Sequence, residues 1–328
     1  MPQLFYFSDT DLAKIRFAFS PLWECISSLR VLRNPSMGAM HLPWIKETRE
    51  KTKHLNLEPL FTLVRDPKNI SNYIPDFLTP PPSTPFPDFK SELETMRCTS
   101  HTIVQHDIKH NYQDLPEIPA YAQTFLDSPE AALDDLALQL EAYWKAALEV
   151  HWTRIQLFLE GDVMLRARQL ALGGADLVFN QLHPTLSYLD HTLIQEKPFA
   201  NAIDLQDQGM ILVPSLFLSS SVMSMCLTPW QPTLIYPAKG SANLWNRPLE
   251  PNSALEALLG NGCALVLKAL QVPTGTLELA GRLQVAPSNI THHLKRLARA
   301  RLVESHCQGR IVYYRHSSRA EDILALYQ

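Results

Sequence analysis

Short polar side chains and cations alternate with apolar residues over positions 287–300, PSNITHHLKRLARA. If this segment is a helix with residues at 100° steps, Ile290, Leu294 and Leu297 fall on one side. Groups that hydrogen-bond or carry positive charge fall on the opposite side and its shoulders. Short polar side chains near the start of such a helix can reach base edges, and cations farther along can meet phosphates. The predicted chemistry is therefore recognition of double-stranded DNA.

The predicted DNA-contacting set comes from this helix and from a hairpin behind it. Residues 302–306 and 310–315 read as two strands, and Gln308-Gly309 between them supplies the positive φ that a tight hairpin needs. Arg310 is placed to enter a minor groove or to hold a phosphate. The residues expected to contact bases are Ser288, Asn289, Thr291 and His292, and the other predicted site residues are Lys295, Arg296, Arg299, Gln308 and Arg310.

A first short helix and a turn must hold the second helix in place. Apolar residues between 277 and 283 give a stripe to this first helix. Residues 285–288 form the turn, and the second helix begins at Pro287 or Ser288. Proline suits a first helical position, and the Ser288 side chain can cap free backbone amides. Two helices, a tight turn and a hairpin in this order predict a winged helix-turn-helix.

Charge separates this segment from the rest of the chain. The protein has 29 Lys and Arg against 33 Asp and Glu, a formal net charge of −4. Eight basic residues and one acid, Glu304, lie between Arg282 and Arg319, whereas the first 250 residues hold 20 basic and 28 acidic residues, a balance of −8. A basic module on an acidic chain is typical of nucleic-acid binding. A charge run can also be an ordinary solvated helix face, but here the basic face, turn and hairpin occur together in the required order.

These C-terminal residues resemble a known family. Residues 283–285 (LQV), 290–294 (ITHHL) and 309–314 (GRIVYY) are similar to the winged-helix domain of ArsR-type bacterial transcription regulators, over roughly the last 75 residues. Residues 11–32 are similar to the part that precedes the winged helix in long regulators of this type. The resemblance implies a DNA-binding regulator, a repressor that acts as a homodimer on an inverted repeat. An unknown small-molecule effector is a further partner to consider.

The sequence departs from that family in two places. Ala300-Arg301 stands where the family usually has Ala-Gly, so we expect that turn to be built differently. Metal-sensing members carry a Cys-x-Cys pair on the helix before the recognition helix, whereas residues 277–281 contain no thiol. Metal sensing of that kind is not implied, and no cofactor is expected.

Length favours two domains in these 328 residues. We expect an N-terminal domain for sensing or dimerisation over residues 1–245 and the winged helix over 251–328, with a linker at 238–253. The predicted fold class is α+β, mostly α, with long helices and a small antiparallel sheet in the N-terminal domain. No apolar run reaches the roughly 18 residues of a membrane span. Five scattered cysteines without a Cys-x-x-Cys pair fit a reducing cytosol, so we expect a cytoplasmic protein that does not bind membranes.

Helix and strand signals recur along the N-terminal domain. Ser8 and Ser20 precede helices as caps. The proline-rich segment 75–87, PDFLTPPPSTPFP, is predicted to be an extended surface loop. Longer helices are expected over 91–110, 128–160 and 162–182, the last kinked at Gly173-Gly174, and β-prone segments over 186–196, 202–205, 210–214 and 233–236.

Two alternatives stay open. An enzyme or ligand-binding domain with an appended DNA-binding module would need a clustered site in the first 250 residues. His106 and His110 can share a helix face, but two histidines are half a metal site. The serines at 219–221 lack the Gly-x-Ser-x-Gly elbow of a hydrolase, so no catalytic residue is assigned. A winged helix that binds protein would show a neutral or apolar outward face, and the basic face argues against it.

Overall fold

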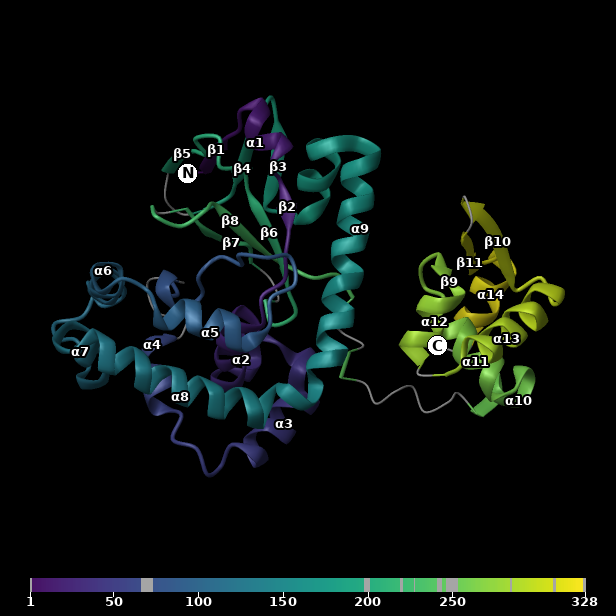
Figure 1. The fold of residues 1–328 in the computed structure, drawn as a ribbon, viewed down its shortest axis with the longest axis horizontal. Helices are drawn as coiled ribbons and strands as arrows, with labels where there is room; N and C mark the ends of the chain where they lie inside the picture. The colour runs from purple at the N-terminus through teal and green to yellow at the C-terminus, as the bar shows by residue number, and fades with distance from the viewer. Residues whose placement is uncertain are drawn as a thin grey trace. The chain divides into compact units, whose positions relative to one another are not determined.

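The computed structural model describes residues 2–65, 73–197, 201–218, 221–226, 228–240, 244–245, 253–283, 285–308 and 311–326. The chain divides into two compact units, Met1–Trp245 and Asn246–Gln328. Both combine helices with small sheets (Figure 1), and in this coarse sense the expected mixed fold is confirmed. Among the described residues, no helix is both long enough and apolar enough to cross a bilayer.

Helices form most of the N-terminal unit. The two expected caps are present, because Ser8 forms a capping box with Asp11 and the Ser20 hydroxyl accepts a hydrogen bond of 2.9 Å from the Trp23 backbone N–H. The helices are α1 (Asp9–Ala13), α2 (Pro21–Arg33), α3 (Leu42–Lys51), α4 (Glu58–Leu63), α5 (Phe89–Arg97), α6 (His101–Asn111), α7 (Ala120–Asp127), α8 (Pro129–Ala147) and α9 (Glu149–Leu182), with 3-10 turns at Pro35–Met37, Ala39–His41 and Asp76–Leu78.

The longest helices begin and end elsewhere than predicted. α8 stops at Ala147 instead of near position 160, and α9 then runs through Gly161 to Leu182. The chain turns at Leu148, which is fully buried, so packing overrides the local preference for continuing the helix. The expected kink is confirmed, because Gly173 and Gly174 both leave helical geometry and Gly174 has φ +63°.

Three further predictions about this unit are wrong. Residues 91–110 are divided between α5 and α6, because Ser100 is extended and starts a new helix. The proline-rich segment is a surface loop only around positions 83–86. Its first part turns inward because the apolar Phe77 and Leu78 are completely enclosed. The start of the expected linker also belongs to this unit, since Trp245 is buried beside Trp44.

The strands of the N-terminal unit form two four-stranded sheets instead of one small antiparallel sheet. Their orders are β3-β4-β1-β5 and β2-β6-β8-β7. β1 pairs antiparallel with β4 but parallel with β5, and β6 pairs parallel with both β2 and β8. The strands are β1 (Gln3–Tyr6), β2 (Arg16–Phe17), β3 (Leu186–Leu189), β4 (Thr192–Gln195), β5 (Asn201–Asp204), β6 (Ile211–Ser215), β7 (Met223–Met225) and β8 (Thr233–Pro237).

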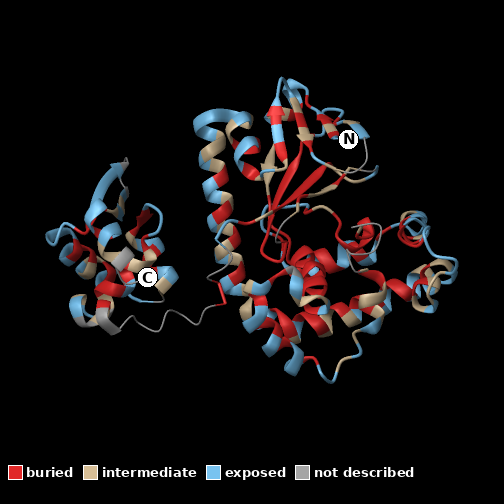
Figure 2. Cartoon of the chain, turned by 180° about the vertical axis from the view of Figure 1, so that it is seen from behind, coloured by how far each residue is buried: buried red, intermediate tan, exposed pale blue. Residues whose placement is uncertain are grey.

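Two hydrophobic clusters fill this unit. The larger joins α2 to α8 with the first part of α9, and the smaller lies between the sheets and the last turns of α9. Figure 2 shows the buried interior in red and much of the outer side of α9 in pale blue. α9 therefore packs against both sheets, through β3 and β6.

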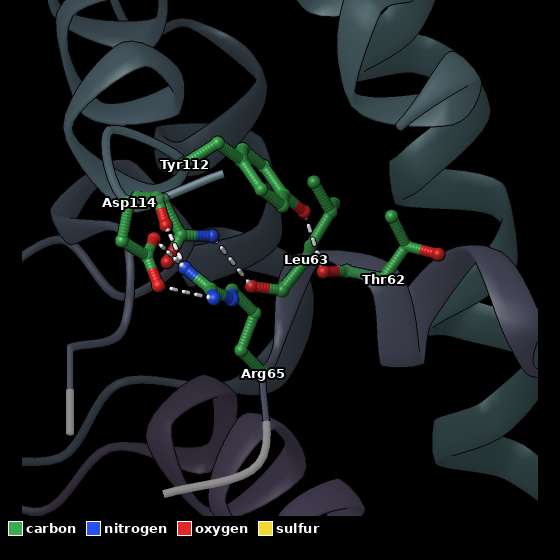
Figure 3. Close-up of polar contacts among 6 residues, drawn as sticks. Thr62, Leu63, Arg65, Tyr112 and Asp114 are labelled. Atoms are coloured by element: carbon green, nitrogen blue, oxygen red, sulfur yellow. Dashed lines mark hydrogen bonds and ion pairs between the residues drawn. The ribbon is translucent and has the colours of Figure 1, made fainter. Parts of the chain in front are cut away.

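A polar junction ties the end of α4 to the end of α6 (Figure 3). The Arg65 guanidinium donates to both Asp114 carboxylate oxygens at 2.6 and 2.8 Å and to the Asn111 carbonyl. The Tyr112 hydroxyl donates to the Thr62 carbonyl at 2.5 Å. The arginine beside Asp114 lowers the pKa of that carboxyl. These bonds link the chain at the end of α4 to the chain at the end of α6.

The C-terminal unit has its own hydrophobic core, to which Leu267, Leu279 and Leu294 contribute fully buried side chains. Its three strands form an antiparallel sheet in the order β10-β11-β9. Gly260, with φ +79°, separates its first two helices. The elements are α10 (Ser253–Leu259), α11 (Asn261–Ala269), β9 (Thr274–Gly275), α12 (Thr276–Leu283), α13 (Pro287–Arg299), β10 (Val303–Gln308), β11 (Ile311–His316) and α14 (Ser318–Leu326).

Candidate nucleic-acid interface

The predicted second helix is α13, and its apolar side faces the core. Ile290 and Leu294 are fully buried, and Leu297 is nearly so. They pack against α11, α12 and β10. This packing fixes the rotation of α13 about its axis, because the three apolar side chains lie on one side of the helix. The opposite side of α13 is therefore held outward by the core.

The start of α13 confirms one prediction and corrects another. Pro287 occupies the first helical position, where its missing N–H is not needed. The capping position falls on Ala286, so no side chain caps the helix, and the prediction that Ser288 does so is wrong. Ser288 lies two residues past the capping position, so it cannot cap the helix. Its exposed hydroxyl is left free of a capping role.

The end of α13 keeps the geometry of a glycine turn although an arginine stands there. Arg301 has φ +56°, a left-handed conformation that normally favours glycine. The Leu302 N–H donates to the Leu297 carbonyl and the Arg301 N–H to the Ala298 carbonyl, both at 2.9 Å. These two bonds make a Schellman motif. The expectation that this turn would be built differently is wrong, because the arginine adopts the strained backbone instead.

Six members of the predicted set share the outward side of α13. Their side chains are exposed, whereas Thr291 is half-buried. The Thr291 hydroxyl donates to the Pro287 carbonyl at 2.9 Å, so it is already used within the helix. The six exposed members are Ser288, Asn289, His292, Lys295, Arg296 and Arg299.

The hairpin part of the predicted set is only partly described. Gln308 is the last residue of β10 and pairs with Ile311 of β11. The Gln308 side chain and the whole of Gly309 and Arg310 lie outside the described residues. The role predicted for Arg310 therefore stays a prediction.

Ion pairs divide the cations of this unit into two groups. Arg282 pairs with Glu278 on α12, and Arg315 donates to one Glu304 oxygen from two nitrogens, at 2.9 and 3.1 Å, across the hairpin. Within the described part of the chain, no carboxylate lies within ion-pair distance of Lys295, Arg296 or Arg299. The second group can bind an anion without giving up an internal partner.

Arg301 and Arg319 are exposed cations that the predicted site did not include. Both belong to the basic segment 282–319. They lie outside α13, so the helix periodicity that predicts the site residues on α13 does not extend to them. The signal that selects Arg301 is structural, because Arg301 is the left-handed residue of the Schellman turn at the end of α13. Arg319 lies in the first turn of α14.

His293 supports α13 from the core side. Its Nδ1 lies 3.7 Å from the Cys263 Sγ of α11. Gly262 is required beside it, because a Cβ at that position would lie 2.3 Å from the imidazole ring. Burial lowers the pKa of His293, and the positive charge of Arg296 adds to this. His293 is therefore a packing residue, in contrast to the exposed His292.

The groups suspected of other chemistry are not gathered into a site by the described residues of the N-terminal unit. His106 and His110 lie with ring centres 6.3 Å apart, and no set of three or more metal-ligating side chains surrounds them or occurs elsewhere in that part. The His183 Nδ1 contacts the Thr185 hydroxyl at 2.8 Å. Two of the three serines, 219 and 220, lie outside the described residues.

Comparisons of the chain with models of known protein families, with characterised proteins and with solved structures found no match. The likeness to ArsR-type regulators therefore rests on the residues quoted from the sequence, and the functional argument rests on the surface of α13.

Proposed function

We propose that the C-terminal unit is a winged helix-turn-helix and that the protein is a sequence-specific DNA-binding transcription regulator, a repressor that acts as a homodimer on an inverted repeat. In this proposal α13 is the recognition helix and the β10–β11 hairpin is the wing. The observation that carries the proposal is the outward side of α13, which combines hydrogen-bonding groups with three cations that have no carboxylate partner among the described residues.

The dimensions of α13 support this assignment. Its 13 residues make a helix about 20 Å long, and the major groove of B-DNA admits one α-helix. Ser288, Asn289 and His292 lie in its first half, where side chains of a recognition helix meet base edges. The cations Lys295, Arg296 and Arg299 lie in its second half, where they would neutralise phosphates. The polar groups that would read the base sequence and the cations that would bind phosphates thus occupy different halves of one face of α13.

A short recognition helix reads only a few base pairs, so a regulator of this kind needs two copies for a specific site. Two-fold symmetric copies read half-sites about one helical turn, roughly 34–36 Å, apart. The expected operator is therefore an inverted repeat. This step depends on the protein being a dimer.

Fluorescence anisotropy with a labelled duplex of random sequence, over a series of salt concentrations, tests the assignment of the face. Arg299→Ala should lower the slope of log affinity against log salt by about one unit, because one phosphate contact is lost. Arg315→Ala is the matched control, since Arg315 is already paired with Glu304. Equal slopes for the parent and Arg299→Ala would remove α13 from the interface.

A further inference from the structure

The exposed side of α9 carries an apolar stripe. Val150, Leu157, Met164, Leu165 and Leu172 are 66, 46, 70, 39 and 72% exposed. The buried side of the same helix holds Ile155, Leu159 and Arg166, so the stripe is not the side that packs on the unit. α9 lies along one flank of the N-terminal unit with this side outward (Figures 1 and 2). Exposed aliphatic side chains gathered on one side of a helix indicate an interaction site.

Four of the five side chains are placed symmetrically about Gly161. At 100° per residue, Leu157 and Leu165 lie about 40° to either side of Gly161, and Val150 and Leu172 about 20° to either side. Each pair is also equidistant from Gly161 along the sequence, by four and by eleven residues. A helix face with this symmetry is complementary to its own antiparallel copy, in which Leu157 meets Leu165 and Val150 meets Leu172.

Packing within one chain does not explain why residue 161 is a glycine. It lies inside a long helix, where glycine costs about 0.5–1 kcal/mol relative to alanine. It does not take a left-handed backbone, and a Cβ added there would meet nothing within 4 Å. A small residue at the centre of an apolar helix face permits close approach of another backbone, which supports a second helix crossing here.

We propose that the exposed side of α9 is the dimer interface, and that it binds the same side of α9 in a second copy of this chain, antiparallel, with the two-fold axis at Gly161. At about 25 cal/mol per Å², the 1.5–3 kcal/mol of a fully buried aliphatic side chain corresponds to on the order of 100 Å². The five side chains are 39 to 72% exposed, so together they still offer about 300 Å², roughly a third of the 800 Å² per partner in a standard interface. The side chains between them supply further area.

Two arginines lie within this stripe. Arg154 and Arg168 are exposed on the same side of α9. In the antiparallel pair Arg154 faces Arg168 of the partner subunit, and this repulsion is screened by salt. The dimer should therefore tighten as salt rises, whereas DNA binding should weaken.

Disulfide cross-linking of the full chain tests the partner and the direction, with the native Cys98, Cys226 and Cys307 replaced by serine. In an antiparallel pair, Leu157→Cys and Leu165→Cys chains should form a two-chain disulfide when mixed but not when each is alone. The two positions are eight residues or about 12 Å apart, beyond the reach of a disulfide. Leu138→Cys on α8, 68% exposed, is the matched control and should not cross-link.

Three outcomes would overturn the proposal. Cross-linking of either variant with itself would indicate a parallel pair. Sedimentation of the parent as one chain at micromolar concentration would exclude the dimer. Binding of a single chain to anionic phospholipid vesicles would assign the stripe to a membrane surface. Leu157→Glu should raise the dissociation constant of the dimer at least tenfold, and Leu138→Glu should not change it. The inference rests on the homodimer of the proposed function but is measured without DNA, so failure of DNA binding leaves it intact.

Discussion

Two exposed helix faces in this protein have opposite chemistry, although each is held in place by the same kind of core. The outward side of α13 carries cations and short polar groups, and the outward side of α9 carries aliphatic side chains around a glycine. Behind them lie fully buried leucines, Leu294 and Leu159. The difference indicates that the core sets the rotation of a helix, whereas the exposed residues determine what it can bind. The basic face suits a polyanion and the apolar face suits another apolar face.

The largest expected effect separates the two faces by function. The triple variant Lys295→Ala, Arg296→Ala, Arg299→Ala should bind DNA roughly a thousandfold more weakly, since hydrogen bonds to charged groups are worth about 1.5 kcal/mol or more each. Its salt slope should fall by about three units. Anisotropy measures the affinity, and sedimentation should give an unchanged mass because α9 is intact. A lower mass in this variant would mean that the faces are not independent.

Removing the core behind α13 is the next largest change. Leu294→Ala should lower the free energy of unfolding of the C-terminal unit by about 2–5 kcal/mol, because a fully buried side chain is replaced by a cavity. Hydrogen exchange of the α13 amides measures this loss. Leu277→Ala is the control, since Leu277 is 77% exposed, and it should change stability by less than about 0.5 kcal/mol. Equal effects of the two substitutions would contradict the packing described here.

Two groups, one in each unit, should contribute pH dependences of opposite sign. Burial raises the pKa of Glu24 to about 8, although the Leu216 N–H donates to it at 3.1 Å. The unfolded chain ionises near 4.5, so the folded state holds more protons between these values. The free energy of unfolding of the N-terminal unit should therefore fall as pH rises from about 4.5 to 8, by up to about 1.4 kcal/mol per pH unit from this carboxyl. In the C-terminal unit, the pKa of His293 is lowered in the folded state. This imidazole therefore adds to the free energy of unfolding above pH 6.5, and its contribution is lost as the pH falls.

Tryptophan fluorescence can follow the N-terminal unit alone, because all six tryptophans lie at or before position 245. Glu24→Gln cannot ionise, so the variant should gain stability relative to the parent when urea unfolding is compared at pH 8 and at pH 5. A difference between variant and parent that is the same at both pH values would show that Glu24 is already ionised in the fold.

The smallest expected effect concerns the turn after α13. Arg301→Gly should stabilise the C-terminal unit by up to about 1 kcal/mol, because glycine adopts φ +56° without strain. The same substitution two residues earlier, Arg299→Gly, should destabilise it by about 0.5–1 kcal/mol, because that residue is inside the helix. Amide exchange in α13 measures both. The same sign for both variants would show that the turn does not govern the end of the helix.

What the sequence predicts well is local. The rotation of α13 follows from the spacing of Ile290, Leu294 and Leu297, and the N-terminal caps follow from Ser8 and Ser20. In each case the groups that interact are within a few residues of one another, so pattern and mechanism coincide.

What the sequence does not predict depends on distant partners. β1 and β2 come from the first 17 residues but pair with strands near positions 193 and 211, so the sheet order has no local signal. The break at Leu148 and the inward turn of Phe77 are made by burial. In the candidate site, the residues exposed on α13 were predictable, whereas the ion pair that occupies Arg315 and the hydrogen bond that occupies Thr291 required the fold.

Selection from a pool of random duplexes shows whether the protein binds a specific DNA sequence. The purified full-length protein is incubated with the pool at near-physiological salt, and the retained duplexes are sequenced. We expect enrichment of an inverted repeat whose half-sites lie about 10 base pairs apart, the spacing of a two-fold dimer on one face of the duplex. A single enriched half-site would keep the DNA-binding face but contradict the dimer on DNA. Failure to retain any duplex, at low salt as well, would contradict the claim that α13 binds DNA.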